Sequence, residues 1–84
     1  MYSMQFQNQK NLVAERVVQK RREKSLTQNE LAARMQTQGA NIDQQNISKI
    51  ERNLRIVTDY ELLCLSRALS VDVYWLRTGE EAHP

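Results

Sequence analysis

Three polar residues in the middle of the chain, Gln44, Gln45 and Lys49, carry side chains that can recognise nucleic-acid bases. A glutamine amide presents a donor beside an acceptor, which matches the N6 and N7 edge of adenine, and a lysine amine can donate to O6 and N7 of guanine. The three residues lie about one helical turn apart, so a single helix would present them together. We therefore predict that these side chains contact bases, provided that a helix begins just before them.

A helix that begins near Asp43 would meet this condition. Asp43 is a suitable N-cap, because its side chain can accept a hydrogen bond from a free amide of the first turn. Ile47 and Ile50 then form an apolar face, which leaves the glutamines and the lysine outside. We predict a helix over about residues 43–52. Taken alone, the two glutamines fit an ordinary solvated face equally well, and Asp43 is either a cap only or an acceptor for cytosine N4.

A second helix precedes this one. Thr27 and Glu30 stand at capping-box spacing and predict a helix over about residues 27–36. Its inner face is formed by Leu31, Ala32 and Met35. The polar stretch Gln36–Asn41 follows and predicts a turn. Two short helices joined by a turn, the second with amides on its outer face, are typical of a helix-turn-helix.

Three further helices complete an all-α prediction. One covers about residues 10–24 and places three residues on one face, Val13, Val17 and Arg21. Another covers about residues 58–69 and begins with a second capping box, Thr58 and Glu61. Its apolar residues are expected to be core: Leu62, Leu65 and Leu69. The last covers about residues 72–77 and has Asp72 as its cap. We expect residues 1–9 and 79–84 to be tails and the whole chain, 1–84, to form a single compact domain.

The composition suits one small domain without a disulfide, metal or cofactor. The chain has 84 residues, of which 40% are hydrophobic and 26% are charged. Cys64 is the only cysteine, and no group of residues has metal-ligand spacing. No catalytic triad, phosphate-binding glycine loop or inward carboxylate pair can be assembled, so we expect no enzymatic activity. The N-terminus is too polar for a signal peptide and no stretch suits a membrane span, so we expect a cytoplasmic protein.

The net charge of +2 conceals an asymmetry along the chain. Residues 1–24 carry six basic and two acidic residues, whereas residues 58–84 carry two basic and five acidic residues. This distribution fits a molecule in which one face meets a polyanion, and it also fits a solvated surface.

Three segments together resemble a known family. They are Leu26–Ala32 (LTQNELA), Ile47–Asn53 (ISKIERN) and Ala68–Leu76 (ALSVDVYWL). They are similar to the Cro/C1-type (Xre family) helix-turn-helix transcriptional regulators of phages and bacteria, and the likeness covers about residues 10–78. The resemblance implies a compact five-helix, lambda-repressor-like fold in which the second and third helices form the helix-turn-helix. It also implies a nucleoid-associated protein that binds a double-stranded DNA operator and represses transcription.

The resemblance also implies roles for individual residues. It assigns base contacts to Gln44, Gln45 and Lys49. It assigns to Gln28 a phosphate contact and a contact that orients Gln44. It also predicts a structural ion pair between Arg21 and Glu51. The remaining contacts with the DNA backbone would come from Lys20, Arg52, Asn53 and Arg55.

The chain departs from the family pattern at two places. The turn Gln36–Asn41 is longer than the usual one, so its extra residues would either lengthen the second helix or loop outward toward the DNA backbone. Contacts near the start of the third helix are therefore less secure than that of Lys49. Asn53 stands where the family often has glycine at a left-handed helix end, and asparagine is the next best residue there.

Two questions of assembly stay open. We expect a homodimer, because one recognition helix makes too few base contacts for tight operator selection. The dimer-interface candidates are Tyr74, Trp75 and Leu76, although Trp75 could instead cover the monomer's own core. An alternative function is that of an antitoxin or adaptor, in which the same fold mainly holds a partner protein such as a toxin or an inducer.

Overall fold

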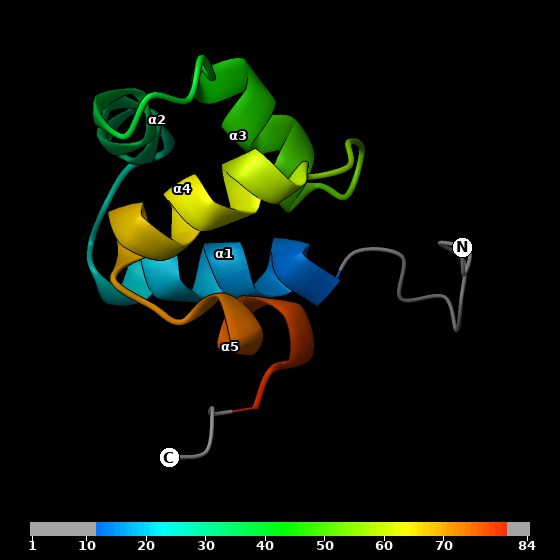
Figure 1. Ribbon diagram of the computed structural model, residues 1–84. Helices are drawn as coiled ribbons and strands as arrows, with labels where there is room; N and C mark the ends of the chain where they lie inside the picture. The colour runs from blue at the N-terminus through cyan, green and yellow to red at the C-terminus, as the bar shows by residue number, and fades with distance from the viewer. Residues whose placement is uncertain (1–11, 81–84) are drawn as a thin grey trace.

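The computed structural model describes residues 12–80, which form five α-helices and no strand (Figure 1). In chain order the helices are α1 (Leu12–Glu23), α2 (Gln28–Thr37), α3 (Gln44–Glu51), α4 (Asp59–Leu69) and α5 (Val73–Thr78). The predicted all-α fold and its five helices are confirmed. The predicted start of the first helix near residue 10 and the tail residues 1–9 and 81–84 lie outside the described residues. None of the five helices is long and apolar enough to cross a membrane.

Local hydrogen bonds fix the helix starts. Thr27 accepts from the amide of Glu30, whose carboxylate accepts in turn from the amide of Thr27, and Thr58 and Glu61 do the same before α4. Both predicted capping boxes are thus confirmed, and Asp43 caps α3 through the amide of Asn46 at 2.9 Å. The predicted cap of α5 is only partly correct. Asp72 occupies the N-cap position, but its side chain makes no capping hydrogen bond.

The first four helices end in the same way. After each of these helices comes one residue with left-handed backbone conformation, and the next residue donates its amide to a carbonyl oxygen of the last helical turn. The left-handed residues are Ser25, Gly39, Asn53 and Ser70. This is the geometry of a Schellman motif, in which an apolar residue next along the chain commonly packs back onto the helix. The left-handed conformation predicted for Asn53 is confirmed, with φ of 63°.

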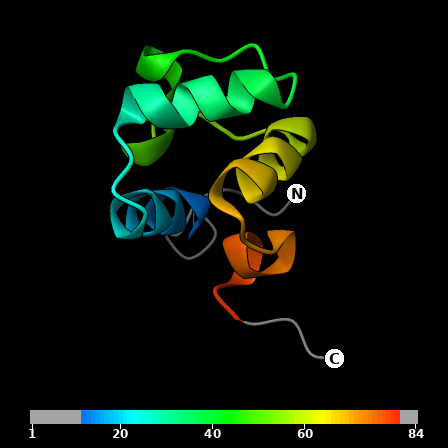
Figure 2. The ribbon, with the colours of Figure 1, turned by 90° about the vertical axis from the view of Figure 1, so that its left-hand side faces the viewer.

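The core lies where α1 packs against α3, α4 and α5, and where α2 packs against α3 and α4. Figures 1 and 2 show α5 on one side of α1 and the pair α2 and α3 on the other. The largest fully buried side chains are Val17, Leu31, Met35, Ile42, Ile47, Ile50, Leu65, Leu69 and Leu76. The inner faces predicted for α2 and α3 are therefore correct. Leu62, predicted to be core, is only partly buried.

The turn between α2 and α3 covers residues 38–43, because α2 continues to Thr37, one residue beyond its predicted end. Exposed and buried residues alternate along the turn, with Gly39 and Asn41 exposed. Ala40 is 3% exposed and Ile42 is 2% exposed, so both side chains belong to the core. Of the two expected paths, the longer second helix is thus correct by one residue. The outward loop is not observed, because the burial of these two apolar side chains holds the rest of the turn against the core.

Candidate nucleic-acid interface

The outer surface of α3 carries the polar side chains that the sequence singled out. Ile47 and Ile50 have no exposed surface, whereas Gln45, Lys49 and Arg52 are exposed. These three residues follow one another at spacings of four and three, so they share one face of the helix. No side-chain hydrogen bond within residues 12–80 engages Gln45 or Lys49, and Arg52 Nε donates to Ser48 Oγ at 3.2 Å. The face thus offers an amide, an amine and a guanidinium to the solvent side.

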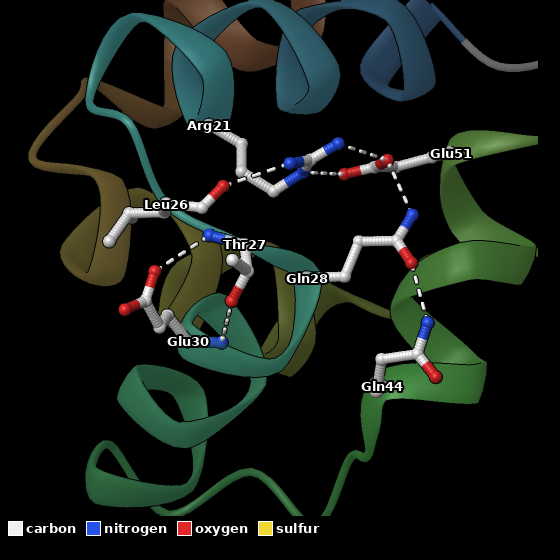
Figure 3. A network of polar contacts seen from close by, with 7 residues as sticks. All are labelled: Arg21, Leu26, Thr27, Gln28, Glu30, Gln44 and Glu51. Atoms are coloured by element: carbon white, nitrogen blue, oxygen red, sulfur yellow. Dashed lines mark hydrogen bonds and ion pairs between the residues drawn. The ribbon is translucent and has the colours of Figure 1, made fainter.

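An ion pair joins α1 to α3 (Figure 3). Arg21 Nε donates to Glu51 Oε2 at 2.6 Å, and Arg21 Nη2 donates to Glu51 Oε1 at 3.0 Å. Arg21 Nη1 also donates to the carbonyl oxygen of Leu26 at 2.9 Å. The two side chains are only 13% and 6% exposed, and the hydrogen bonds with Glu51 raise the pKa of Arg21. This two-pronged contact restricts the rotation of α3 relative to α1.

Two glutamine amides extend the ion pair to the start of α3. Gln28 Nε2 donates to Glu51 Oε1 at 2.9 Å, and Gln44 Nε2 donates to Gln28 Oε1 at 2.6 Å. Gln28 therefore links the carboxylate of Glu51 at one end of α3 to the amide of Gln44 at the other (Figure 3). The bracing of Gln44 was expected from the family pattern, but the link from Gln28 to Glu51 was not. Together with Arg21 these residues form the network that we call the α1–α2–α3 network: Arg21, Gln28, Gln44 and Glu51.

Arg55, which the resemblance assigned to the DNA backbone, forms an ion pair within the chain. Its Nη1 and Nη2 donate to the two carboxylate oxygens of Glu61 at 2.8 and 2.7 Å. These hydrogen bonds lower the pKa of Glu61 and raise the pKa of Arg55. The same carboxylate also accepts from the amide of Thr58 in the capping box. The sequence signal that was overlooked is an arginine shortly before a capping-box glutamate.

Lys20, a further candidate for a phosphate contact, lies on the α5 side of α1. Its amine is 2.9 Å from Glu23 Oε1 and 5.2 Å from the centroid of the Trp75 ring. Both partners are on α1 and α5, away from α3. The structure therefore does not bring Lys20 together with the exposed face of α3.

The three dimer-interface candidates differ in exposure. Leu76 is completely buried, so it cannot contact a second copy, and its assignment is wrong because its side chain is needed in the core. Trp75 packs partly against the core, and Tyr74 is exposed. The most exposed large apolar residues among those described are Leu54 and Ile56, at 63% and 72%, in the loop between α3 and α4. Sequence periodicity could not reveal them, because this loop has none.

The described residues contain no cluster of side chains suited to a metal ion. Cys64 is buried and not in a disulfide.

A helix that presents an amide and two cations, with a second helix braced across its start, defines a helix-turn-helix DNA-binding domain. Comparison with known families agrees: the helix-turn-helix family model matches residues 17–76, which include most of the chain. The chain belongs to this family, the Cro/C1-type (Xre) DNA-binding regulators. Comparisons with curated proteins and with solved structures gave no match.

The buried ion pair leads to a stability prediction. Arg21→Ala should lower the free energy of unfolding by about 1 to 3 kcal/mol, because it leaves the nearly buried Glu51 carboxylate without its cation. Arg22, the next residue, is exposed, so Arg22→Ala removes the same charge but should change the free energy of unfolding by less than about 0.5 kcal/mol. Denaturant unfolding of both variants at one pH measures the difference. Equal losses, or a larger loss for Arg22→Ala, would contradict this role for Arg21.

The ion pair of Arg55 and Glu61 leads to a prediction about pH. Because folding lowers the pKa of Glu61, its contribution to stability is complete above the unfolded value of about 4.3 and is lost as the pH falls through the lower folded value. Glu61→Gln should therefore reduce the loss of stability below about pH 4.3.

Arg55→Gln should have the same effect, and the double variant should add little to either single one. Arg22→Gln, the control, removes an exposed cation and should keep the parent's acid dependence. Unfolding by denaturant at a series of pH values tests this. Parallel pH profiles for the parent and Glu61→Gln would show that the pair is not stabilising.

Proposed function

We propose that the protein is a sequence-specific repressor that inserts α3 into the major groove of double-stranded DNA. The observation that supports this most directly is the exposed face of Gln45, Lys49 and Arg52, held in place by the α1–α2–α3 network. An α-helix fits the major groove, where every base pair presents a distinct pattern of donors and acceptors. A bound domain of this kind can repress transcription by occupying the operator.

We assign the readers and the anchors separately. Gln45 and Lys49 read bases, and Gln44 joins them at the start of α3, where its amide nitrogen is oriented by Gln28. The DNA backbone is held by Arg52 and Asn53 at the end of α3 and by Gln28 in the first turn of α2, where unpaired amides favour an anion. Arg55 and Lys20 have partners within the chain, so they are not among the residues that we assign to the DNA backbone.

The test is a titration with random duplex DNA, followed by selection of bound sites from a random pool. Binding to random duplex should be weak and should fall with salt, since each phosphate contact by a cation adds about 0.9 to the slope of log affinity against log salt. The selected operator should bind more tightly than random DNA. Affinity for the operator that does not change between low and moderate salt would contradict the backbone contacts.

Variants of the base-contacting residues and of the backbone-contacting residues should show different binding defects. Gln45→Ala and Lys49→Ala should each cost about 1 to 3 kcal/mol on the operator and relax the preference at one base pair per half-site, with little change on random duplex. Arg52→Ala should weaken binding to operator and random DNA alike. The control is Arg67→Ala, which removes an exposed cation from α4 and should leave both affinities unchanged. A panel of single-base operator variants measures this, and unchanged preferences in both reader variants would mean that α3 does not read the bases.

We further propose that the protein binds DNA as a homodimer through Leu54 and Ile56. Leu54 follows the left-handed Asn53 and is the exception among the four helix ends: the corresponding residues Leu26, Ala40 and Val71 pack against the core. The loop is fixed in place, because the amide of Leu54 donates to the carbonyl oxygen of Lys49 at 2.8 Å and Arg55 is held by Glu61.

A second copy is the occupant that fits this surface, because the loop directly follows α3. A two-fold axis at the loop would bring two recognition helices to one side of the dimer, as two adjacent half-sites require. Two apolar side chains per copy fall far short of a stable interface, which buries about 1,200 to 2,000 Å² in total. We therefore expect monomers in dilute solution and dimers on the operator.

Substitution within the loop tests the dimer. Ile56→Asn should reduce the affinity for a two-half-site operator toward that for a single half-site, and should leave single half-site binding unchanged. Leu63→Asn is the matched control, because Leu63 is an exposed leucine on the outer surface of α4. Titrations with one and two half-sites measure the cooperativity. Loss of cooperativity in both variants, or in neither, would place the interface elsewhere.

The exposed apolar loop also favours a second candidate function, that of an antitoxin or adaptor whose partner is a different protein. No DNA binding even at low salt would favour this function over the first. An antitoxin that represses its own operon would bind both the DNA and the partner protein.

A further inference from the structure

The turn between α2 and α3 is contacted by two side chains of α4, of which Tyr60 is the exposed one. Tyr60 Oη donates to the carbonyl oxygen of Gln38 at 3.2 Å, and Cys64 Sγ lies 3.8 Å from the same oxygen. Tyr60 is 54% exposed, so its ring contributes little to the buried core. Its hydroxyl instead meets the backbone at the point where α2 has just ended.

Gly39 leaves the space that the Tyr60 hydroxyl occupies. Its φ of 98° lies in the region that favours glycine, and a Cβ at this position would come within 2.6 Å of Tyr60 Oη. The tyrosine hydroxyl thus approaches the space that the side chain of any other residue would need. On the far side of the turn, Gln36 Nε2 donates to the carbonyl oxygen of Ile42 at 2.8 Å.

The turn leads directly into α3, the helix that we propose contacts the bases. Its last residue, Asp43, is the N-cap of α3, and Gln44 and Gln45 are the next two residues. A displacement of this turn would therefore move Gln44 and Gln45, in the first turn of α3, more than Lys49, which lies in its last turn. The buried side chains of Ala40 and Ile42 hold the turn from inside, and Tyr60 holds it from outside.

We propose that Tyr60 is a positioning residue that fixes the long turn and thereby determines which base pairs Gln44 and Gln45 recognise. α4, which is not part of the helix-turn-helix, would then contribute to operator selection. This inference rests on the proposed function in its reading of DNA, but the fixing of the turn can be measured without DNA.

The test is Tyr60→Phe, with Tyr74→Phe as the matched control. Tyr74, on α5, is also an exposed tyrosine, and its hydroxyl donates to Glu80 Oε1 at 3.4 Å. In the free protein, Tyr60→Phe should speed amide hydrogen exchange at Ala40 and Ile42 by about twofold to tenfold, the loss expected for one hydrogen bond. Tyr74→Phe should leave these two rates unchanged.

On the selected operator, Tyr60→Phe should weaken the preferences at the base pairs opposite Gln44 and Gln45 and preserve that opposite Lys49. A merely stabilising role would lower all preferences together or none, so either of those results would overturn the proposal. Parent-like exchange in Tyr60→Phe would overturn it too. If exchange is faster but the parent itself binds no DNA, the proposed function fails while the fixing of the turn by Tyr60 is upheld.

A double variant provides an independent check. Gly39→Ala should destabilise the fold, both through its positive φ and through the contact with the Tyr60 hydroxyl. Adding Tyr60→Phe removes that hydroxyl, so the double variant should be no less stable than Gly39→Ala alone. If the losses of stability in Gly39→Ala and Tyr60→Phe simply add in the double variant, the Tyr60 hydroxyl does not occupy the space that a Cβ at Gly39 would need, and the proposal fails.

Discussion

The bidentate contact between Arg21 and Glu51 is the constraint on which the arrangement of the helices around the interface depends. Taking two charges out of water is costly, and a buried ion pair often stabilises a fold less than apolar residues of the same size. What the pair supplies here is geometry. Because the carboxylate of Glu51 can satisfy Arg21 and Gln28 together only when α1, α2 and α3 meet at one place, other packings of these helices would leave a charge buried without a partner.

The same constraint explains how a short helix can present a defined surface. α3 has eight residues and only two fully buried side chains, Ile47 and Ile50. Two apolar contacts leave a helix free to roll and slide, since apolar packing is not directional. Hydrogen bonds at both ends, at Gln44 and at Glu51, remove this freedom. The exposed face therefore has a fixed direction before any partner arrives.

The local features of the fold could be predicted from the sequence because their signals are local. Capping boxes join residues three apart, and apolar spacing identifies the inner faces of α2 and α3, so the helix boundaries came within two residues at the described ends. The pair of Arg21 and Glu51 was reached only through the family resemblance. No rule of spacing joins residues 30 positions apart.

The features that could not be predicted all depend on tertiary contacts. Nothing in the segment Gln38–Asp43 distinguishes a turn that folds inward from one that projects, until the space beneath Ala40 and Ile42 is known. Leu76 and Leu54 are equally apolar in the sequence, yet one is fully buried and the other is mostly exposed. Lys20 and Arg55 read as free cations, and only the packing of α5 and the start of α4 provides their partners.

The position of Trp75 gives the domain a built-in optical signal. It is the only tryptophan in the chain, it packs partly against the core, and the amine of Lys20 lies over its ring. α1 and α4 separate α5 from α3 (Figure 1). Since indole emission responds to nearby charge and to water, its fluorescence would report the docking of α5 on α1 and be nearly silent to events at α3. Unfolding could therefore be followed by tryptophan emission in the presence of a ligand bound to the opposite side of the molecule.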